Sequence, residues 1–307
     1  MTRKPIILDT DIGTDVDDLL ALSLVLTSPE LELVGVTTVY GDVVLRARMV
    51  RRLLTLRGVI GIPLAMGASK PLLGKRAVYW EGHEGKGLLT PGEEAAPLPD
   101  EHAVDMIVRT VMARPGEITL VAIGPLTNVA LAFLREPRLA QALAGLLIMG
   151  GSVGGACALH LPWTEHNFRC DPEAAYVVLA AGAPTWIVPL DVTTQVRIRQ
   201  ADVERLHGLG DPFHRAVADQ VASYPSFTKR GGWTYLHDPL AVATAIDSTL
   251  VTWQPVRAVI ETGGEHTAGQ LLVAPPPLMG PSRPRWRWMW TSSAASVSSS
   301  IASCAKE

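Results

Sequence analysis

The order of the apolar segments limits most strongly what this chain can fold into. Over its first two-thirds, short apolar runs rich in β-branched residues alternate with longer segments whose apolar residues recur at helical spacing. This βαβ order is typical of a parallel sheet covered by helices, so we predict an α/β fold with an open, mostly parallel sheet and a Rossmann-like core. The candidate strands are residues 5–9, 31–39, 62–67, 118–124, 145–151 and 184–191, and the candidate helices between them are 17–26, 44–56, 102–113, 126–137 and 171–182.

The rest of the chain belongs to the same unit in this interpretation. Beyond residue 191 the pattern becomes mainly helical, with candidate helices at 201–209, 213–224 and 237–246 before a β-like run at 255–264. No repeat of about 20 to 50 residues is visible, and the Gly/Pro-rich stretches at 85–99 and 150–162 are too short for domain linkers. We predict a single domain over residues 1–307, with long functional loops.

Composition excludes several classes of partner. The formal net charge of -3 comes with no basic stripe, so nucleic acid is not an expected partner. No uninterrupted apolar run approaches the roughly 20 residues needed to span a bilayer, and the N-terminus lacks the apolar region of a signal peptide. Cys157, Cys170 and Cys304 have neither paired nor metal-ligand spacing. Free thiols fit a reducing compartment, and we expect a cytoplasmic protein.

Five aspartates lie at the end of the first predicted strand. In open parallel sheets, ligands bind beyond the carboxyl ends of the strands. The later strands are also followed there by carboxylates, hydroxyls and glycines. The aspartates are Asp9, Asp11, Asp15, Asp17 and Asp18, and the later positions include Asp42, Ser69, Thr127, Asn128, Gly150 and Asp191.

So many acidic groups at one edge need a counter-charge. Carboxylates a few ångströms apart in a partly dry cleft repel one another, and a divalent cation would relieve the repulsion. The candidate ligands are all oxygen atoms, which suits Ca²⁺ or Mg²⁺ and argues against zinc. An Asp-x-Asp at a strand end is also common as a helix cap beside a solvated turn, so these residues alone leave both interpretations open.

Five motifs in order carry a resemblance to a known family. "DTDIGTDVDD" resembles the DxDxGxDD signature of the calcium-dependent nucleoside hydrolases of the inosine-uridine-preferring type. "AIGPLTNVALA", "IMGGS", "EHNFRCDPEAA" and "HDPLAVA" resemble its later motifs, so the resemblance covers residue 5 to about 265. It implies the nucleoside hydrolase fold, a homodimer or homotetramer, and hydrolysis of the N-glycosidic bond of ribonucleosides to a free base and ribose.

The same resemblance implies a calcium site and a general base. Asp11, Asp18, Asp238 and the main-chain carbonyl of Thr127 would bind Ca²⁺. Asp11 would also take a proton from a calcium-bound water that attacks C1′ of the ribose.

Further residues are implied to contact the substrate. His237 would face the nucleobase as leaving-group acid or as a group that orients it, and His83 would lie in a loop near the substrate. The aromatic residues themselves suggest that Trp233 belongs to a lid over residues 224–233 that stacks on the base, although aromatic side chains are more often part of a core. The ribose-binding and other substrate-binding positions are Asp17, Asp42, Met149, Glu165 and Asn167.

The chain departs from the family pattern at three positions near this site. Two extra residues precede the aspartate pair, which leaves Asp15 as a carboxylate without a role. Asp42 stands where the family usually has asparagine, and it can accept hydrogen bonds but cannot donate them when ionised. The loop after Met149 lacks an expected asparagine. The preference between purine and pyrimidine substrates therefore stays open.

The C-terminal tail departs most. From about residue 275 to 307, "RPRWRWMWTSSAASVSSS" replaces the strand and final helix that the family pattern leads us to expect. Tryptophan and methionine each have one codon, and another reading frame of a back-translation of residues 285–292 gives Leu-Ala-Leu-Asp-Val-Asp-Val. Our hypothesis is a frameshift somewhere after about Ala274.

Two alternative functions remain from the sequence. "DTDIGT" is close to the DxDGT motif of haloacid-dehalogenase phosphatases, although Ile12 separates the aspartate from the glycine. The altered tail and ribose contacts also allow a catalytically impaired, Ca²⁺-dependent nucleoside-binding protein. Release of phosphate from a phosphomonoester would favour the first alternative, and tight nucleoside binding without turnover would favour the second.

Overall fold

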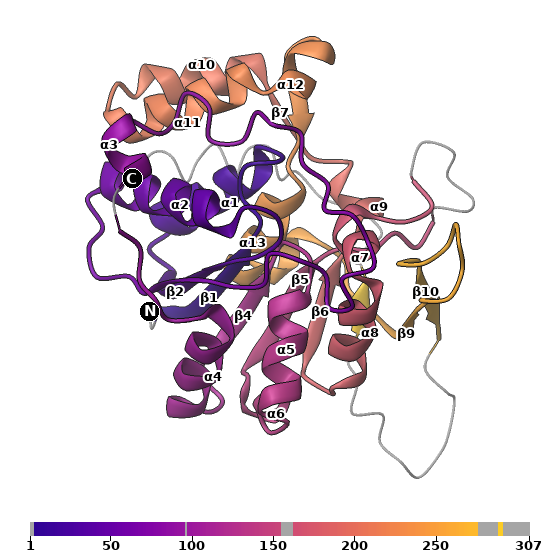
Figure 1. Ribbon diagram of the computed structural model, residues 1–307. Helices are drawn as coiled ribbons and strands as arrows, with labels where there is room; N and C mark the ends of the chain where they lie inside the picture. The colour runs from indigo at the N-terminus through magenta and orange to yellow at the C-terminus, as the bar shows by residue number, and fades with distance from the viewer. Residues whose placement is uncertain (1–2, 96, 155–161, 276–287, 291–307) are drawn as a thin grey trace.

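A six-stranded parallel sheet forms the centre of the molecule. The computed structural model describes residues 3–95, 97–154, 162–275 and 288–290 (Figure 1). The strand order is β3-β2-β1-β4-β5-β6, and every neighbouring pair is parallel. This confirms the predicted α/β fold. The strands are β1 (Lys4–Thr10), β2 (Leu31–Thr38), β3 (Leu64–Met66), β4 (Thr119–Ala122), β5 (Gly145–Met149) and β6 (Thr185–Val188).

Helices cover both faces of this sheet because its strands are apolar on both sides. In β1, Ile6 and Leu8 belong to one hydrophobic core, whereas Ile7 between them belongs to the other. The helices that contribute to the first core include α1 (Asp17–Thr27), α2 (Val43–Arg57) and α13 (His237–Ile246). Those of the second are α4 (Ala103–Ala113), α5 (Thr127–Arg135), α6 (Leu139–Ala142) and α8 (Pro172–Ala180).

A helical layer lies beyond one end of the sheet. In Figure 1, α10 (Gln200–Gly208), α11 (Pro212–Ser223) and α12 (Pro225–Lys229) lie together above α1 and α2. A short antiparallel pair, β7 (Arg197–Arg199) and β8 (Trp233–Tyr235), connects this layer to α13. The remaining short elements are α3 (Pro91–Ala95), α7 (His166–Cys170), α9 (Leu190–Thr193) and the 3₁₀ turn Ser248–Leu250. None of the helices described is long and apolar enough to cross a membrane.

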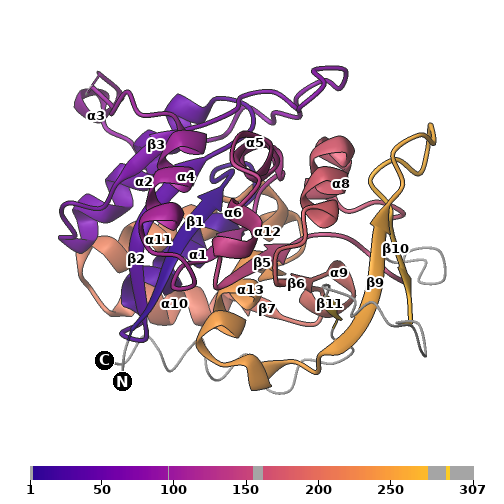
Figure 2. The ribbon, with the colours of Figure 1, turned by 90° about the horizontal axis from the view of Figure 1, so that it is seen from below.

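A second sheet packs outside α8. Here β9 (Gln254–Ile260) pairs antiparallel with β10 (Leu271–Ala274) on one side and β11 (Trp288–Trp290) on the other (Figure 2). A groove of about 410 Å³ between α8 and this sheet includes Tyr176 and Leu272 in its lining, and shares no lining residue with the acidic cluster described below. Of the tail that prompted the frameshift hypothesis, residues 276–287 and 291–307 lie outside the described residues, so the hypothesis stays a prediction.

The sixth strand is shorter than predicted. The apolar run 184–191 favoured a strand up to Asp191, but β6 ends at Val188 and α9 begins at Leu190. Pro189 explains the difference, because proline has no N–H to donate to a neighbouring strand. Asp191 instead accepts hydrogen bonds from the backbone amides of Val153 and Gly154, at 2.8 and 2.6 Å.

Candidate active site

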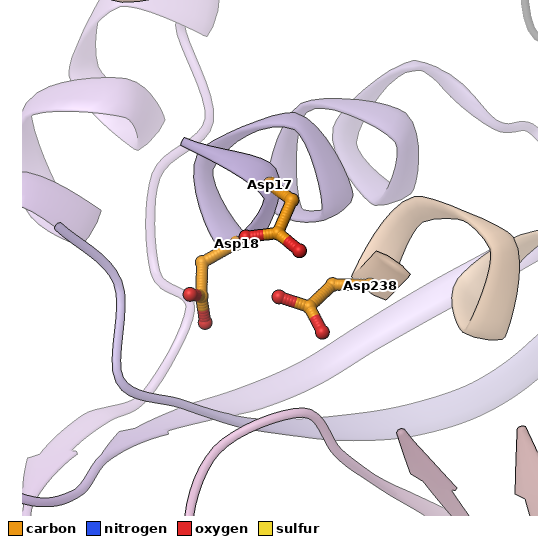
Figure 3. A group of neighbouring side chains, drawn as sticks. All are labelled: Asp17, Asp18 and Asp238. Carbon is orange, nitrogen blue, oxygen red and sulfur yellow. The ribbon is translucent and has the colours of Figure 1, made fainter. Parts of the chain in front are cut away.

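Three buried carboxylates from two helices meet at one point. Asp17 and Asp18 lie in the first turn of α1, and Asp238 lies in the first turn of α13. One oxygen of each carboxylate lies within 4.8 Å of the other two, and the three side chains point toward a common space (Figure 3). Packing of α1 against α13 brings them together. The residue before α1, Val16, makes no side-chain cap, and both aspartates face the cluster instead of capping the helix.

Asp11 adjoins this cluster from the end of β1. Its side chain is buried, and its charge acts on Asp17, Asp18 and Asp238. Gly124, which follows β4, makes room for it: a Cβ at that position would lie 2.7 Å from Asp11 Oδ1. The glycine of "AIGPLTN" is therefore needed for close approach of two strand ends.

The cluster is electrostatically unfavourable by itself. Burial, followed by the charges of neighbouring aspartates, raises the pKa of Asp17, Asp18 and Asp238 well above the ordinary range for aspartate. The N-termini of α1 and α13 point their partial positive charge toward these groups, but a helix terminus offsets only about 1 kcal/mol.

A divalent cation fits this arrangement. Converging, buried and mutually repelling carboxylate oxygens form the ligand set that Ca²⁺ and Mg²⁺ prefer, and the three-residue cluster contains no imidazole or thiolate that would favour zinc. Thr127 is buried at the start of α5, and its hydroxyl donates to Asp171 Oδ2 at 2.6 Å. The role of its main-chain carbonyl as a calcium ligand stays a prediction.

A buried network supports the strand end that carries Asp11. Asp9 accepts hydrogen bonds from Thr37 Oγ1 at 2.6 Å and from Asn128 Nδ2 at 2.8 Å. The Asn128 amide also accepts from the backbone N–H of Ala68 at 2.8 Å. Burial raises the pKa of Asp9 to about 7. Asn128 Nδ2 also donates to the Thr38 carbonyl at 3.1 Å, so this residue joins the chain at the ends of β1, β2 and β3. Apart from its place after Thr127, nothing in the sequence predicts these contacts.

Substitution of Asn128 by alanine is expected to destabilise the protein. The change leaves the buried carboxylate of Asp9 with one donor fewer and the half-buried amide of Ala68 without its acceptor, which costs about 2 to 4 kcal/mol in the free energy of unfolding. Urea denaturation measures this directly. Gln141→Ala, at an exposed position in α6, is the control and should change the unfolding free energy by less than about 0.5 kcal/mol. Equal midpoints for both variants would contradict this role.

Glu165 and Asn167 lie beside the end of β5. The Glu165 carboxylate caps α7 by accepting from the amides of Asn167 and Phe168, and it also accepts from Gly151 N at 2.9 Å. Asn167 Nδ2 donates to the carbonyls of Ile123 and Met149, at 2.8 and 3.1 Å. Both predicted substrate-binding side chains, and Met149 with them, are therefore held at the carboxyl ends of β4 and β5.

His237 is the first residue of α13, and side chains of two other elements contact its ring. Its Nδ1 lies 2.7 Å from Thr193 Oγ1, and its ring lies 5.1 Å from that of Tyr235. Burial, with a smaller contribution from the Arg230 charge, lowers the pKa of His237 to about 3. The imidazole is therefore neutral near neutral pH, and a neutral ring can orient a base by hydrogen bonding.

Asp15 has a definite partner in the lid region. Tyr224 Oη, between α11 and α12, donates to Asp15 Oδ2 at 2.8 Å, and the ring of Tyr224 lies 5.9 Å from that of His83. The extra carboxylate thus connects the acidic loop to the layer above it. Trp233 lies in β8, where the guanidinium carbon of Arg197 is 4.2 Å from its ring centroid.

Asp42 is placed differently from the other predicted substrate contacts. It is exposed and caps α2 by accepting from the backbone N–H of Leu45 at 2.9 Å. The carboxylate of Asp42 therefore caps a helix in this structure, and its contact with ribose stays a prediction.

Comparison with known proteins agrees with this geometry. A family model described as "Inosine-uridine preferring nucleoside hydrolase" matches residues 6–294. The chain belongs to this family. It is therefore a nucleoside hydrolase, and the matched region includes every candidate residue of the acidic cluster. This family match favours a nucleoside hydrolase over the phosphatase alternative.

Curated relatives cover most of the chain. The pyrimidine-specific ribonucleoside hydrolase RihA of Enterobacter sp. (strain 638) is 38% identical over 280 residues, covering 88% of this chain and 87% of the relative. RihA of Salmonella typhimurium is 35% identical over 277 residues, covering 88% of each chain.

Solved structures match the fold along its whole length. The plant nucleoside hydrolase PpNRh1 superposes with a TM-score of 0.84 at 27% identity, covering 100% of this chain and 98% of that one. The purine-preferring ribonucleoside hydrolase of Gardnerella vaginalis gives 0.80 at 28% identity and covers 99% of both chains. The nucleoside hydrolase fold is confirmed.

Proposed function

We propose that the protein hydrolyses the N-glycosidic bond of ribonucleosides with Ca²⁺ as cofactor, and that pyrimidine ribonucleosides are its preferred substrates. The observation that carries the proposal is the convergence of Asp17, Asp18 and Asp238 beside Asp11 at the carboxyl edge of the sheet. The pyrimidine preference is supported by the names of the RihA relatives, which are more similar to this chain than the purine-preferring structure is.

The acidic residues divide between the cation and the sugar. Asp11, Asp18, Asp238 and the carbonyl of Thr127 would hold Ca²⁺. When bound, the cation neutralises the repulsion within the cluster and makes a nearby water more acidic. Asp17, Glu165 and Asn167 would hold the ribose hydroxyls, with Met149 and Asp42 beside them, and the surrounding carboxylates stabilise positive charge that develops on the sugar.

The reaction needs a group that accepts a proton from the attacking water and a nucleobase that leaves from C1′. Asp11 takes a proton from a water whose oxygen forms the new bond to C1′. The bond between C1′ and the base nitrogen breaks, and the base leaves with its electron pair and takes a proton from solvent water, while Asp11 returns its proton to solvent. His237 orients the base, since a neutral imidazole held by Thr193 has a fixed direction for its second nitrogen.

Ribose release from a panel of nucleosides tests the proposal. We expect reducing sugar from uridine and cytidine at higher kcat/KM than from inosine and adenosine, with Ca²⁺ present. No release from any nucleoside by folded protein would overturn it, whereas phosphate release from phosphomonoesters, or nucleoside binding without turnover, would identify one of the two alternatives. The homo-oligomeric state and the cytoplasmic location stay predictions.

A further inference from the structure

Arg46 is a buried arginine beside the acidic cluster. It is the fourth residue of α2 and has no exposed surface. Its guanidinium donates from three nitrogens to three oxygens: the carbonyl of Tyr40 at 2.6 Å, the carbonyl of Ile12 at 2.8 Å and the hydroxyl of Thr14 at 3.1 Å. Asp11 Oδ2 lies farther away, at 3.9 Å. Two of the three bonds therefore go to the loop that follows Asp11, whereas Asp11 itself is a more distant partner.

The same guanidinium meets two other loops. Tyr40 has a φ of 64°, the one positive value among the non-glycine residues described, and its carbonyl makes the shortest of the three bonds. A non-glycine residue in this conformation needs support from its surroundings. The ring of Trp80 covers the guanidinium from the other side, with Arg46 Cζ 5.1 Å from its centroid. Trp80 belongs to the loop that also carries His83.

The charge of Arg46 also reaches the cluster. Its guanidinium lowers the pKa of Asp18, against the larger opposing effect of burial. Two effects of Arg46 on a bound cation are therefore in competition. As a counter-charge it would weaken attraction for a cation, and as a support for the loop after Asp11 it would strengthen binding by fixing the ligand in place. Two direct bonds to the loop, with a third bond that anchors the guanidinium on the Tyr40 carbonyl, favour the second effect over one ion pair at 3.9 Å.

We propose that Arg46 is a positioning residue that holds the 11–14 loop, and with it Asp11, in the geometry that the cation and the attacking water require. It touches neither substrate nor cation. Its part in the reaction rests on the proposed function, but its part in ordering the loop does not.

Hydrogen exchange of the metal-free protein gives the first test. Arg46→Met keeps an apolar stem as far as the position of Nε but removes the guanidinium and with it every donor. We expect the amides of residues 11–14 to exchange at least about 10-fold faster than in the parent protein. Arg46→Lys should give an intermediate rate, because one ammonium cannot reach three separated oxygens. Arg52→Met, on the same helix but ion-paired with Glu93 at 2.8 Å, is the matched control and should leave these amides unchanged.

Calcium binding and kinetics give the second test. By calorimetry, Arg46→Met should bind Ca²⁺ about 10- to 100-fold more weakly than the parent and the Arg52→Met control. With saturating Ca²⁺, kcat should fall about 10- to 100-fold, whereas KM should change less than about 3-fold because other elements hold the ribose.

Three outcomes would overturn the proposal. They are unchanged exchange at residues 11–14, unchanged or tighter calcium binding, and equal kinetics for the Arg46 and Arg52 variants. If Arg46→Met does not fold, the same comparisons on Arg46→Lys decide. Hydrogen exchange and calorimetry need no substrate. If the parent protein releases no ribose, the proposed function is wrong, but these two measurements still test whether Arg46 orders the 11–14 loop.

Discussion

Asp11→Asn is expected to reduce ribose release from uridine by at least ~10³-fold with Ca²⁺ present. Asparagine keeps the shape of the side chain that packs against Gly124, but its amide cannot take a proton and is a weaker ligand than a carboxylate. The fall should appear mainly in kcat. A reducing-sugar assay over a range of uridine concentrations measures both kcat and KM.

Asp219→Asn is the matched control for this substitution. Asp219 is exposed on α11, where its carboxylate lies 3.8 Å from the His207 ring at the surface, so its loss should leave kcat within about 2-fold. Circular dichroism of both variants establishes that they fold. Turnover of Asp11→Asn at the rate of Asp219→Asn would show that another group acts as the base.

Removal of the cation is expected to abolish turnover and to make stability strongly dependent on pH. Burial and mutual repulsion raise the folded-state pKa of Asp17, Asp18 and Asp238, and burial raises that of Asp9 to about 7. Groups of this kind take up protons on folding. Their contribution to stability is present below the ordinary aspartate pKa of about 4 and is lost as pH rises through the folded values. We therefore expect chelator-treated protein to lose at least ~2 kcal/mol of unfolding free energy between pH 5 and pH 8.

Added Ca²⁺ should restore both turnover and the free energy of unfolding. A ligand at 100 times its dissociation constant stabilises the folded state by about 2.7 kcal/mol, and the gain should be larger at pH 8 than at pH 5 because ionised carboxylates bind the cation. Urea unfolding at both pH values, with chelator or with Ca²⁺, measures this. A metal-free protein that is equally stable at pH 5 and pH 8, or full turnover in chelator, would contradict the expectation.

The strand-end residues were predictable because of a rule that is independent of packing detail. Parallel strands place their carboxyl ends at one edge, so Asp11, Thr127 and the Met149 region could be assigned to a common edge from strand positions alone. The helix at 237–246 was predicted with the bounds that α13 has, because Asp238 and Pro239 mark a helix start.

Other parts of the site depend on contacts between distant segments, which the periodicity of apolar residues does not predict. The helix α2 carries several arginines, and only the structure distinguishes the buried Arg46 from the others. Likewise, the partner of Asp15 is Tyr224, on a distant element of the chain. The three-residue strands β7 and β8 are too short for an alternating pattern to be recognised.

The position of one short strand, β11, bears on the frameshift hypothesis for the tail. Trp288–Trp290 pairs with β9 within the region where the shifted reading frame gives Leu-Asp-Val-Asp, which is the kind of strand the family pattern leads us to expect. The frameshift hypothesis therefore proposes a native strand at the same place, and sequencing the gene across codons 274–307 tests it. A single uninterrupted frame whose alternative readings contain no helical continuation would contradict it.

The acidic cluster draws its ligands from opposite ends of the folded chain. Asp17 and Asp18 come from the first helix and Asp238 from the last α-helix described, so a cation bound between them would act as a removable cross-link between early and late segments. During synthesis the centre can therefore assemble only after α13 has emerged from the ribosome. An incomplete chain that stops before Asp238 would have all six strands of the central sheet but an unfinished centre, which would keep partial products from hydrolysing nucleosides.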